Sequence, residues 1–480
     1  MNKLSFSILL LAVSFGAGCK SGNEELAVFE GGKIIRQDIR DYYALQNIQI
    51  NETTGSIKNQ TSVLENLAIQ SLVQKENSGK KVEETADYKN LREISERQLT
   101  VNLYIRNFLN QVKEDRDMEM AEIQFIFMRG GSEKSEAVFK EISALSDKKA
   151  VNEFIMKNTE EEGRKALAGY LEPQCINCLA SQLTELVFKE GIEKKDGKFY
   201  KKEFEGNSYI YRITEVKKVK AKKLEAYLKG KFKDFREMAI EYQNAAQNEN
   251  QKKSAEYYAE DDPKLSEKAK MTANHYTKKF EEKIWPDEFE KLLQDSGYLI
   301  AEVAKQSPDI LSKEKPETVL LSKGETKFTV ADLEKEFAKI NGYRNSSPNR
   351  SAEMLEMQRF LHNLIIPGKV IADSDKGKTV RASEQYKTAE KFMDRSLYWA
   401  LFVKDIQTKN REVSDAEVKS VYEAGKSTAY AKMSFDQAKD RIRHEMIQSK
   451  SEMEMKKSVQ DLKTKYKLQF FTDKLKAGTV

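Results

Sequence analysis

Apolar residues recur at steps of three and four along much of this chain, and that spacing predicts long amphipathic helices. The longest is predicted from about residue 86 to 112, where Leu91, Ile94, Val101 and Ile105 fall on one stripe. A second stripe includes Leu64 and Leu67, and further amphipathic helices are predicted after residue 226 and after residue 263. The last long helix is predicted to begin at the capping box Ser434-Phe-Asp-Gln437.

One segment, residues 120–219, departs from this helical pattern. The apolar run over residues 119–128 predicts a strand that is buried on both faces. Helical spacing follows over residues 137–145, and the pair Asp196-Gly197 predicts a hairpin turn. The β-rich run over residues 207–216 predicts a central strand. The segment is therefore predicted to form a small α+β domain.

The order of these elements resembles a parvulin-type peptidyl-prolyl isomerase domain. The resemblance rests on an opening strand, a long helix, a Gly-x-Leu turn at Gly169-Tyr-Leu171, a short helix and a closing strand. It implies a peptide-binding pocket. A simpler alternative is that Phe125 and Leu186 are ordinary core residues. The pocket residues implied by the resemblance are Gln124, Phe125, Leu171, Leu186 and Tyr209.

The segment also departs from the parvulin pattern. The family places a histidine in the opening strand, where this chain has Gln124, and another in the closing strand, where the aligned residue is Tyr209. Tyr170 replaces the acidic residue of the family's Gly-Asp-Leu-Gly turn. The resemblance thus implies a domain that binds peptides with little or no isomerase activity, and it assigns no catalytic residue. The three histidines of the protein lie outside the segment, at His275, His362 and His444.

Two parts of the chain outside this segment resemble each other. Residues 86–99 match residues 384–397, with Tyr88 and Tyr386 at positions 298 apart (386 − 88). This match predicts a duplicated helical module, and two copies are too few for a solenoid. The alternative is a coincidence between two amphipathic helices. The predicted copies span residues 26–119 and about 319–411.

The two ends of the chain resemble exported foldases of the SurA and PrsA kind. In that family a strand, a Gly-Lys turn and a helix begin the mature protein, as residues 26–44 do here. A long helix and a terminal strand end the protein and fold back onto the N-terminal module, and residues 434–471 resemble them.

The predicted fold class is mainly α with an α+β parvulin-like domain and a duplicated helical module, closed by a long C-terminal helix and a short strand. The predicted segments are a lipoprotein signal peptide (1–18), an N-terminal helical module (19–119), the parvulin-like domain (120–219), a helical connecting region (220–315), and a second helical module with the C-terminal helix (316–480).

The composition fits a helix-rich globular protein. Of the 480 residues 33% are charged and 39% are hydrophobic, and only 7 are prolines. The 82 basic and 77 acidic residues nearly balance, which argues against a dedicated nucleic-acid-binding protein. The sequence has no phosphate-binding loop, dinucleotide-binding turn, metalloprotease motif or nucleophile elbow. We therefore expect no nucleotide, cofactor or metal.

The N-terminus resembles a bacterial lipoprotein signal. Lys3 is followed by an apolar run over residues 4–15, which is too short to span a bilayer, then by Gly16-Ala-Gly18 and Cys19. The family prefers leucine three places before the cysteine, where this protein has Gly16. The resemblance implies lipid attachment at Cys19 and a place in the bacterial cell envelope, facing the periplasm or exposed at the surface. An ordinary secretory signal is the alternative.

The remaining cysteines, Cys175 and Cys178, form a Cys-Ile-Asn-Cys motif. A structural disulfide suits an exported protein and is the favoured interpretation. Free thiols, a redox pair and a metal site remain as alternatives. A redox pair would need a thioredoxin-like setting, and a zinc site would need further ligands nearby.

These features predict an ATP-independent chaperone that binds unfolded or extended polypeptides, such as envelope or outer-membrane proteins, and contacts the membrane through its lipid anchor. Two other functions stay open at this point. One is an active parvulin-type peptidyl-prolyl isomerase, and the other is a surface lipoprotein used for adhesion or scaffolding.

Overall fold

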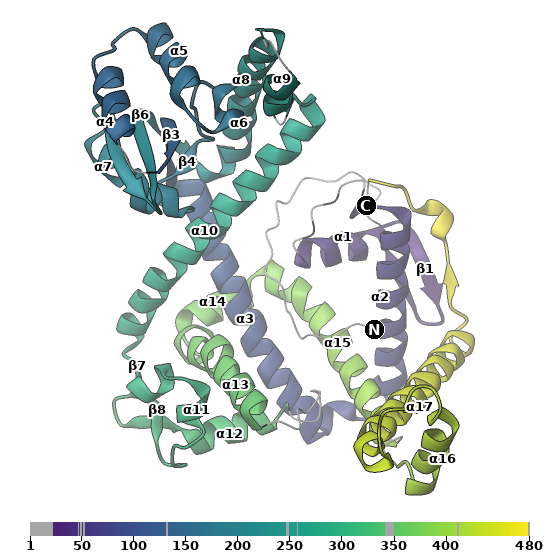
Figure 1. Cartoon of the computed structure of the whole chain (residues 1–480). Helices are drawn as coiled ribbons and strands as arrows, with labels where there is room; N and C mark the ends of the chain where they lie inside the picture. Colours follow the sequence, from purple (N-terminus) through teal and green to yellow (C-terminus); the bar gives the residue numbers. More distant parts are fainter. Residues whose placement is uncertain are drawn as a thin grey trace. The chain divides into compact units, whose positions relative to one another are not determined.

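The structure is a computed structural model that describes residues 23–46, 48, 50, 53–130, 133–245, 249–256, 258–340, 350–409 and 412–478. Within these residues the chain is mainly helical, with three small antiparallel sheets (Figure 1). It divides into two compact units. The first contains the described residues up to Asn107 together with those from Leu292 onward, and the second contains residues 108–291. The predicted connecting region, residues 220–315, is thus divided between the units.

The first unit combines the N-terminal part of the chain with the C-terminal part. Its N-terminal elements are β1 (Glu25–Phe29), β2 (Gly32–Ile35), α1 (Arg36–Leu45), α2 (Ile57–Ser78), η2 (Val82–Glu84) and most of α3 (Ala86–Asp115). Its other elements are the end of α10 (Asp262–Ser296), β7 (Leu299–Ile300), η5 (Glu302–Lys305), α11 (Pro308–Leu311), β8 (Val319–Lys323), β9 (Thr326–Thr329), α12 (Val330–Ala338), α13 (Arg350–Phe360), η7 (Leu361–Ile365), η8 (Gly368–Ala372), α14 (Asp375–Ala382), α15 (Glu384–Lys409), α16 (Asp415–Gly425), α17 (Phe435–Lys465), β10 (Gln469–Phe470) and η9 (Thr472–Lys474).

The second unit holds a four-stranded sheet and a set of long helices. Its elements are the end of α3, β3 (Asp117–Arg129), α4 (Glu133–Ser143), α5 (Lys148–Asn158), α6 (Glu162–Lys165), β4 (Gln174–Cys175), η3 (Leu183–Val187), α7 (Lys189–Lys194), β5 (Tyr200–Phe204), β6 (Asn207–Lys220), η4 (Ala221–Lys223), α8 (Leu224–Ala245), α9 (Glu249–Glu256) and α10 (Asp262–Ser296).

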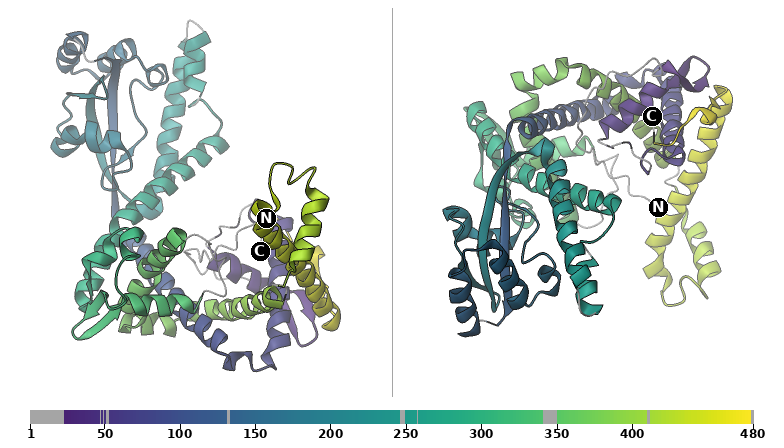
Figure 2. Two further views of the ribbon diagram at one scale, coloured as in Figure 1. Left: turned by 60° about the horizontal axis from the view of Figure 1, so that its bottom comes forward. Right: turned by 90° about the horizontal axis from the view of Figure 1, so that it is seen from above.

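The sheet of the second unit has the strand order β4-β3-β6-β5, and all its pairs are antiparallel. Figure 2 shows the sheet and the helices beside it from two further directions. One face carries Ile126, Met128 and Ile210, which pack against α4 and α5. Burial of each such side chain contributes about 1.5–3 kcal/mol, so this face holds the helices firmly. Nearer the start of β3, Met118 and Met120 pack against α8 and α10.

The hairpin turn of this sheet lies at a different position from the predicted one. Asp196-Gly197 does not connect two strands, because it follows the end of α7, where Lys195 is left-handed. The Asp196 carboxylate accepts hydrogen bonds from the Lys198 N–H and the Tyr200 hydroxyl, at 3.1 and 2.9 Å. The hairpin turn is Glu205-Gly206, between β5 and β6, and both of its residues have positive φ. Two adjacent residues with positive φ are what a two-residue hairpin turn needs, and the glycine meets that need at no steric cost.

The first unit contains two small sheets built in the same way, β10-β1-β2 and β7-β8-β9. In each, a hairpin has a register shift at the start of its first strand, after Glu25 in one and after Val319 in the other. In each, a two-residue strand that follows a long helix pairs with that first strand. A backbone hydrogen bond continues each pairing, from Phe471 N to Leu26 O at 2.9 Å and from Ala301 N to Leu320 O at 3.0 Å.

Helices α3 and α15 run antiparallel within this unit. Asp87 pairs with Lys404, and Tyr88 packs on Tyr398 with ring centroids 5.6 Å apart. Near the middle of the contact, Arg92 forms ion pairs with Glu390 and Asp394, at 2.9 and 2.8 Å. Each of these pairs has one residue on α3 and the other on α15. The contact between the two helices therefore joins the N-terminal and C-terminal parts of the unit.

The helix start at Ser434 is confirmed. The Gln437 N–H donates to the Ser434 hydroxyl and the Ser434 N–H donates to the Gln437 amide oxygen, which completes the capping box of α17. The predicted terminal strand is short: α17 ends at Lys465, and only Gln469–Phe470 form β10.

Candidate peptide-binding face

The face of the four-stranded sheet opposite α4 and α5 is rich in aromatic side chains. Strands β3 and β6 place these side chains together, because Phe125 is the register partner of Tyr211 and Phe127 that of Tyr209. Paired residues of neighbouring strands share one face of a sheet. We call this cluster the aromatic face. It consists of Phe125, Phe127, Phe188, Tyr209 and Tyr211.

Phe188 lies at the centre of the aromatic face. It is 0% exposed, and its ring centroid lies 6.1 Å from that of Phe125 and 5.0 Å from that of Tyr211. Tyr209 stacks on Phe125 at 6.2 Å and meets Phe127 edge-on at 5.4 Å. Each such aromatic pair contributes about 0.5–1.5 kcal/mol beyond its buried area. Phe125, Phe188 and Tyr211 therefore form a rigid floor, whereas Phe127 and Tyr209 are only half-buried.

Tyr209 keeps its hydroxyl proton at neutral pH. Burial raises the pKa of Tyr209 above its usual value, and the carboxylates of Glu161 and Glu205 raise it further. A half-buried tyrosine of this kind presents an apolar ring and a hydroxyl that can donate a hydrogen bond.

The Gly169-Tyr-Leu171 turn lies against the edge of β3. The Phe125 N–H donates to Gly169 O and the Leu171 N–H donates to Ile123 O, both at 2.9 Å. Gly169 has a φ of +78°, and a Cβ atom there would lie 2.4 Å from the carbonyl oxygen of Phe125. Only glycine allows this close approach, which brings Leu171 into the cluster beneath the aromatic face.

Gln124 lies on the opposite face of β3 and is 0% exposed. Its amide nitrogen donates to Asn152 Oδ1 and Ala168 O, both at 2.8 Å. Its amide oxygen accepts from Nε and Nη2 of Arg212, at 2.9 and 2.7 Å. All four hydrogen-bonding positions of the side chain are occupied by protein partners. The structure therefore gives Gln124 a supporting role for the strand, away from the aromatic face.

The five residues predicted to line the pocket are thus brought together only in part. Phe125, Leu171 and Tyr209 belong to one cluster, and Gln124 lies behind it. Leu186, in η3, is 49% exposed, although Val187 and Phe188 beside it are buried. Sequence reasoning missed Phe188, Arg212 and Asn152. Phe188 was missed because a single phenylalanine in an amphipathic turn carries no distinctive sequence signal. Asn152 and Arg212 were missed because they lie in α5 and β6, far from Gln124 in the sequence.

Cys175 and Cys178 are joined by a disulfide with an S–S distance of 2.05 Å. Both are buried against α8 and α10 in the cluster that contains Met118 and Met120. Cys19 lies outside the described residues. Among the residues that the structure describes, no group of three or more His, Cys, Asp or Glu side chains could hold a metal ion. No helix in the described part of the protein is long and apolar enough to cross a bilayer.

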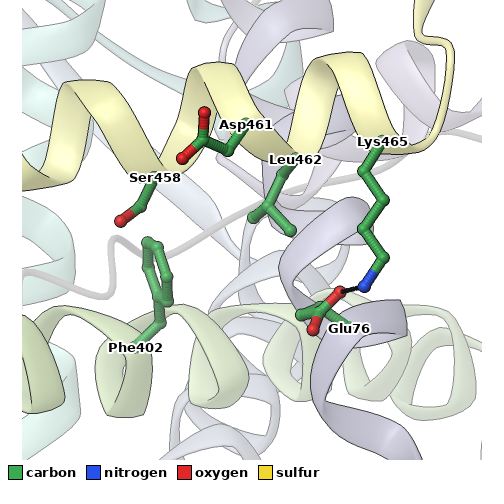
Figure 3. A pocket seen from close by; sticks show the side chains of 6 residues that line it. All are labelled: Glu76, Phe402, Ser458, Asp461, Leu462 and Lys465. Carbon is green, nitrogen blue, oxygen red and sulfur yellow. Dashed lines mark hydrogen bonds and ion pairs between the residues drawn. The ribbon is translucent and has the colours of Figure 1, made fainter.

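A separate open hollow of about 330 Å³ lies in the first unit, between α2, α15 and α17 (Figure 3). The Lys465 ammonium pairs with the Glu76 carboxylate at its rim, at 2.6 Å. Hydrogen bonds from Lys465, Lys80 and Tyr466 lower the pKa of Glu76 to about 2. None of the predicted site residues lines this hollow, whose lining consists of Glu76, Phe402, Ser458, Asp461, Leu462 and Lys465.

Searches among curated proteins and among solved structures each found no significant match. A protein-family model described as ":-like" matches residues 1–480, and because the match covers the full length, the protein belongs to that family.

Proposed function

We propose that this protein is an ATP-independent chaperone that holds unfolded or extended envelope proteins, outer-membrane proteins among them. The observation that carries the proposal is the aromatic face, where half-buried Phe127 and Tyr209 lie over a rigid floor and Leu186 is exposed nearby. Such a surface can bind apolar side chains of many sequences, because it offers contact area without a narrow set of polar partners.

The arrangement of the second unit supports a parvulin-like domain at residues 120–219. Its described elements include, in the order that the resemblance implies, an opening strand (β3), the Gly169-Tyr-Leu171 turn, short helices (η3 and α7) and a closing strand (β6). Where the resemblance implies one long helix, the protein has the shorter helices α4, α5 and α6, and strands β4 and β5 are additional. The turn lies against β3 through two backbone hydrogen bonds. On this proposal α8, α9 and α10 are a helical addition packed on one end of the domain.

The first unit supports a duplicated module. Equivalent residues of its two hairpins are 294 positions apart (321 − 27), since Ala27 pairs with Ile34 and Leu321 with Phe328. The closing strand β10 returns to β1, which fits the fold-back at the C-terminus that the SurA and PrsA resemblance implies. On this proposal each hairpin is completed by a two-residue strand that follows a long helix outside the two predicted copies, α17 before β10 and α10 before β7.

The proposed domain binds peptides with little or no isomerase activity. The family's strand histidines are replaced by Gln124 and Tyr209, and Gln124 is enclosed on the far side of the sheet. The active isomerase remains the second candidate, because an apolar pocket can by itself favour a twisted peptide bond that has lost its resonance. In a proline-peptide isomerisation assay we expect a rate close to the uncatalysed one. Strong catalysis that Tyr209→Ala abolishes would favour the isomerase.

We expect the soluble form that lacks residues 1–19 to suppress the aggregation of a urea-diluted outer-membrane protein at a near-equimolar ratio without nucleotide, as followed by light scattering. Leu186→Ser should weaken this suppression several-fold, because it removes exposed apolar area beside the aromatic face. Met271→Ser is the matched control, since Met271 is 66% exposed on α10 of the same unit and lies outside the aromatic face. Absence of suppression by the unmodified protein would reject the holdase function.

The proposed location is the bacterial envelope, with a lipid on Cys19 and the body facing the periplasm. Protease treatment of whole cells separates this from the surface-lipoprotein alternative, because a surface adhesin would be cut and a periplasmic chaperone would be protected. A Cys19→Ala variant should lose the lipid and partition into the aqueous phase of a detergent extraction.

A further inference from the structure

Arg106 of α3 is buried, and no ion pair joins it to a carboxylate of the described residues. The residue is 4% exposed, and neither Nε nor Nη2 has an acceptor among the residues that the structure describes. A guanidinium group is positively charged at every physiological pH and carries only donors. Burying it without an acceptor is costly, since neither water nor protein replaces the hydrogen bonds it would otherwise make.

Asn102 presents a second donor on the same side of the helix. It lies one turn before Arg106, at a spacing of four residues that places two side chains on one face of a helix. Its amide nitrogen is also buried and has no acceptor within the described part of the protein. Between them in sequence, Leu103 packs against Val380 of α14 and Tyr386 of α15. The two donors therefore lie on a helix that packs against α14 and α15 within the first unit.

Other arginines of this protein show what the Nε–Nη2 edge binds. Arg36 uses that edge to hold one carboxylate oxygen of Glu24, at 2.9 and 2.7 Å. Arg212 uses the same edge to hold the amide oxygen of Gln124, also at 2.9 and 2.7 Å. In both cases the two N–H groups converge on an oxygen acceptor. The Nε–Nη2 edge of Arg106 carries the same two N–H donors, and it is buried, whereas a surface arginine exposes this edge to water.

Burial lowers the pKa of Arg106 to about 10, so the side chain remains charged at neutral pH. Desolvation is the cause of this shift, and no carboxylate within the described part of the protein offsets it. An anion at this position would restore the missing interaction, and a carboxylate matches the planar, two-donor edge of a guanidinium group.

We propose that Arg106 and Asn102 bind a carboxylate group of a polypeptide, with the Nε–Nη2 edge of Arg106 holding its oxygens and the amide of Asn102 donating a further hydrogen bond. The carboxylate is that of an aspartate or glutamate side chain or of a free C-terminus. This inference rests on the proposed function, because a holdase supplies the extended polypeptide. It adds an electrostatic specificity to a protein whose aromatic face selects only for apolar side chains.

The test compares three fluorescent peptides that share one apolar, proline-free sequence, with binding to the purified full-length protein in detergent measured by fluorescence anisotropy. The first peptide is blocked at both ends and has one aspartate, the second has asparagine in its place, and the third has asparagine and a free C-terminal carboxylate. We expect a carboxylate-bearing peptide to bind about 10- to 100-fold more tightly than the neutral one. The first and third peptides distinguish a side-chain carboxylate from a terminal one.

Arg106→Met should abolish this preference and leave the affinity for the neutral peptide unchanged, and Asn102→Ala should reduce the preference several-fold. Arg106→Lys keeps the charge but loses the paired edge, so it should retain only part of the preference. Because Arg106→Met removes an unpaired buried charge, its thermal midpoint without peptide should equal or exceed that of the unmodified protein. A lower midpoint would mark Arg106 as a structural residue and overturn the proposal.

Equal affinities of the three peptides for the unmodified protein would overturn the carboxylate site and leave the holdase function standing. A preference that survives Arg106→Met would also overturn it. If no peptide binds and aggregation is not suppressed, the proposed function itself fails.

Discussion

Phe188→Ala is expected to lower the free energy of unfolding of the second unit by about 3–5 kcal/mol. Phe188 is 0% exposed and contacts the rings of Phe125, Tyr209 and Tyr211, so the truncated side chain would leave a cavity under the aromatic face. The sheet cannot close this cavity readily, because β3 pairs with β6 along all 13 of its residues, with one register shift between Glu122 and Ile123.

The two tryptophans of the protein allow this loss to be assigned to one unit. Trp285 lies in the second unit, where it packs on Phe108 with ring centroids 6.0 Å apart, and Trp399 lies in the first. In a Trp399→Phe background, urea unfolding followed by Trp285 fluorescence reports the second unit. In a Trp285→Phe background, the same experiment on Trp399 reports the first unit, whose midpoint Phe188→Ala should not change.

Leu186→Ala is the matched control for stability. Leu186 lies two residues before Phe188 and is 49% exposed, so its truncation should change the free energy of unfolding by less than about 0.5 kcal/mol. The assignment of Phe188 to the core would be wrong if both variants lost similar stability, or if Phe188→Ala lost less than about 1 kcal/mol.

Gly169→Ala is expected to destabilise the second unit by about 2–4 kcal/mol, measured in the same Trp399→Phe background. The positive φ of Gly169 disfavours alanine, and the added Cβ would also collide with the Phe125 carbonyl oxygen at 2.4 Å and the Ile155 side chain at 2.5 Å. Backbone atoms of a central strand cannot move away cheaply. The turn would therefore separate from β3, and Leu171 would leave the cluster.

Gly206→Ala separates the two causes. Gly206 has nearly the same φ, +75° against +78°, but a Cβ there would meet no atom within 4 Å. Its substitution should cost about 1 kcal/mol, from backbone conformation alone. Equal losses for the two variants would show that the close approach of the turn to β3 contributes nothing to stability.

Local sequence patterns carry much of the secondary structure because they act over a few residues. The helical stripe from residue 86 predicts α3, whose observed bounds are Ala86–Asp115, and the capping box at Ser434 marks the start of α17. The predicted position of the hairpin turn is wrong. Asp196-Gly197 and Glu205-Gly206 both supply a glycine with positive φ, and the choice between them depends on which residues of β5 pair with β6.

In the candidate site, too, local sequence patterns predict the elements, whereas the tertiary structure decides which faces they bury. The apolar run over residues 119–128 predicts a strand buried on both faces, yet its alternation alone does not say which face meets α4 and α5 and which becomes the aromatic face. The resemblance to parvulins places Gln124 in the pocket. Gln124 and Phe125 are neighbours in β3, so their side chains lie on opposite faces of the sheet. Asn152, Ala168 and Arg212, which are distant in sequence, meet the amide of Gln124 on its face.

The sequence by itself determined the helix-rich composition, the long amphipathic helices, the α+β character of residues 120–219 and the internal similarity between residues 86–99 and 384–397, since each is a property of short-range pattern. The resemblance to exported foldases implied a fold-back of the C-terminus, but only the tertiary structure decided that β10 pairs with β1, that β7 completes the hairpin at β8, and that Arg92 meets Glu390 across α3 and α15. It alone also shows that Nε and Nη2 of the buried Arg106 have no acceptor in the described residues. These outcomes depend on pairing between groups far apart in the sequence, where a two-residue strand or a single arginine carries no pattern that identifies its partner.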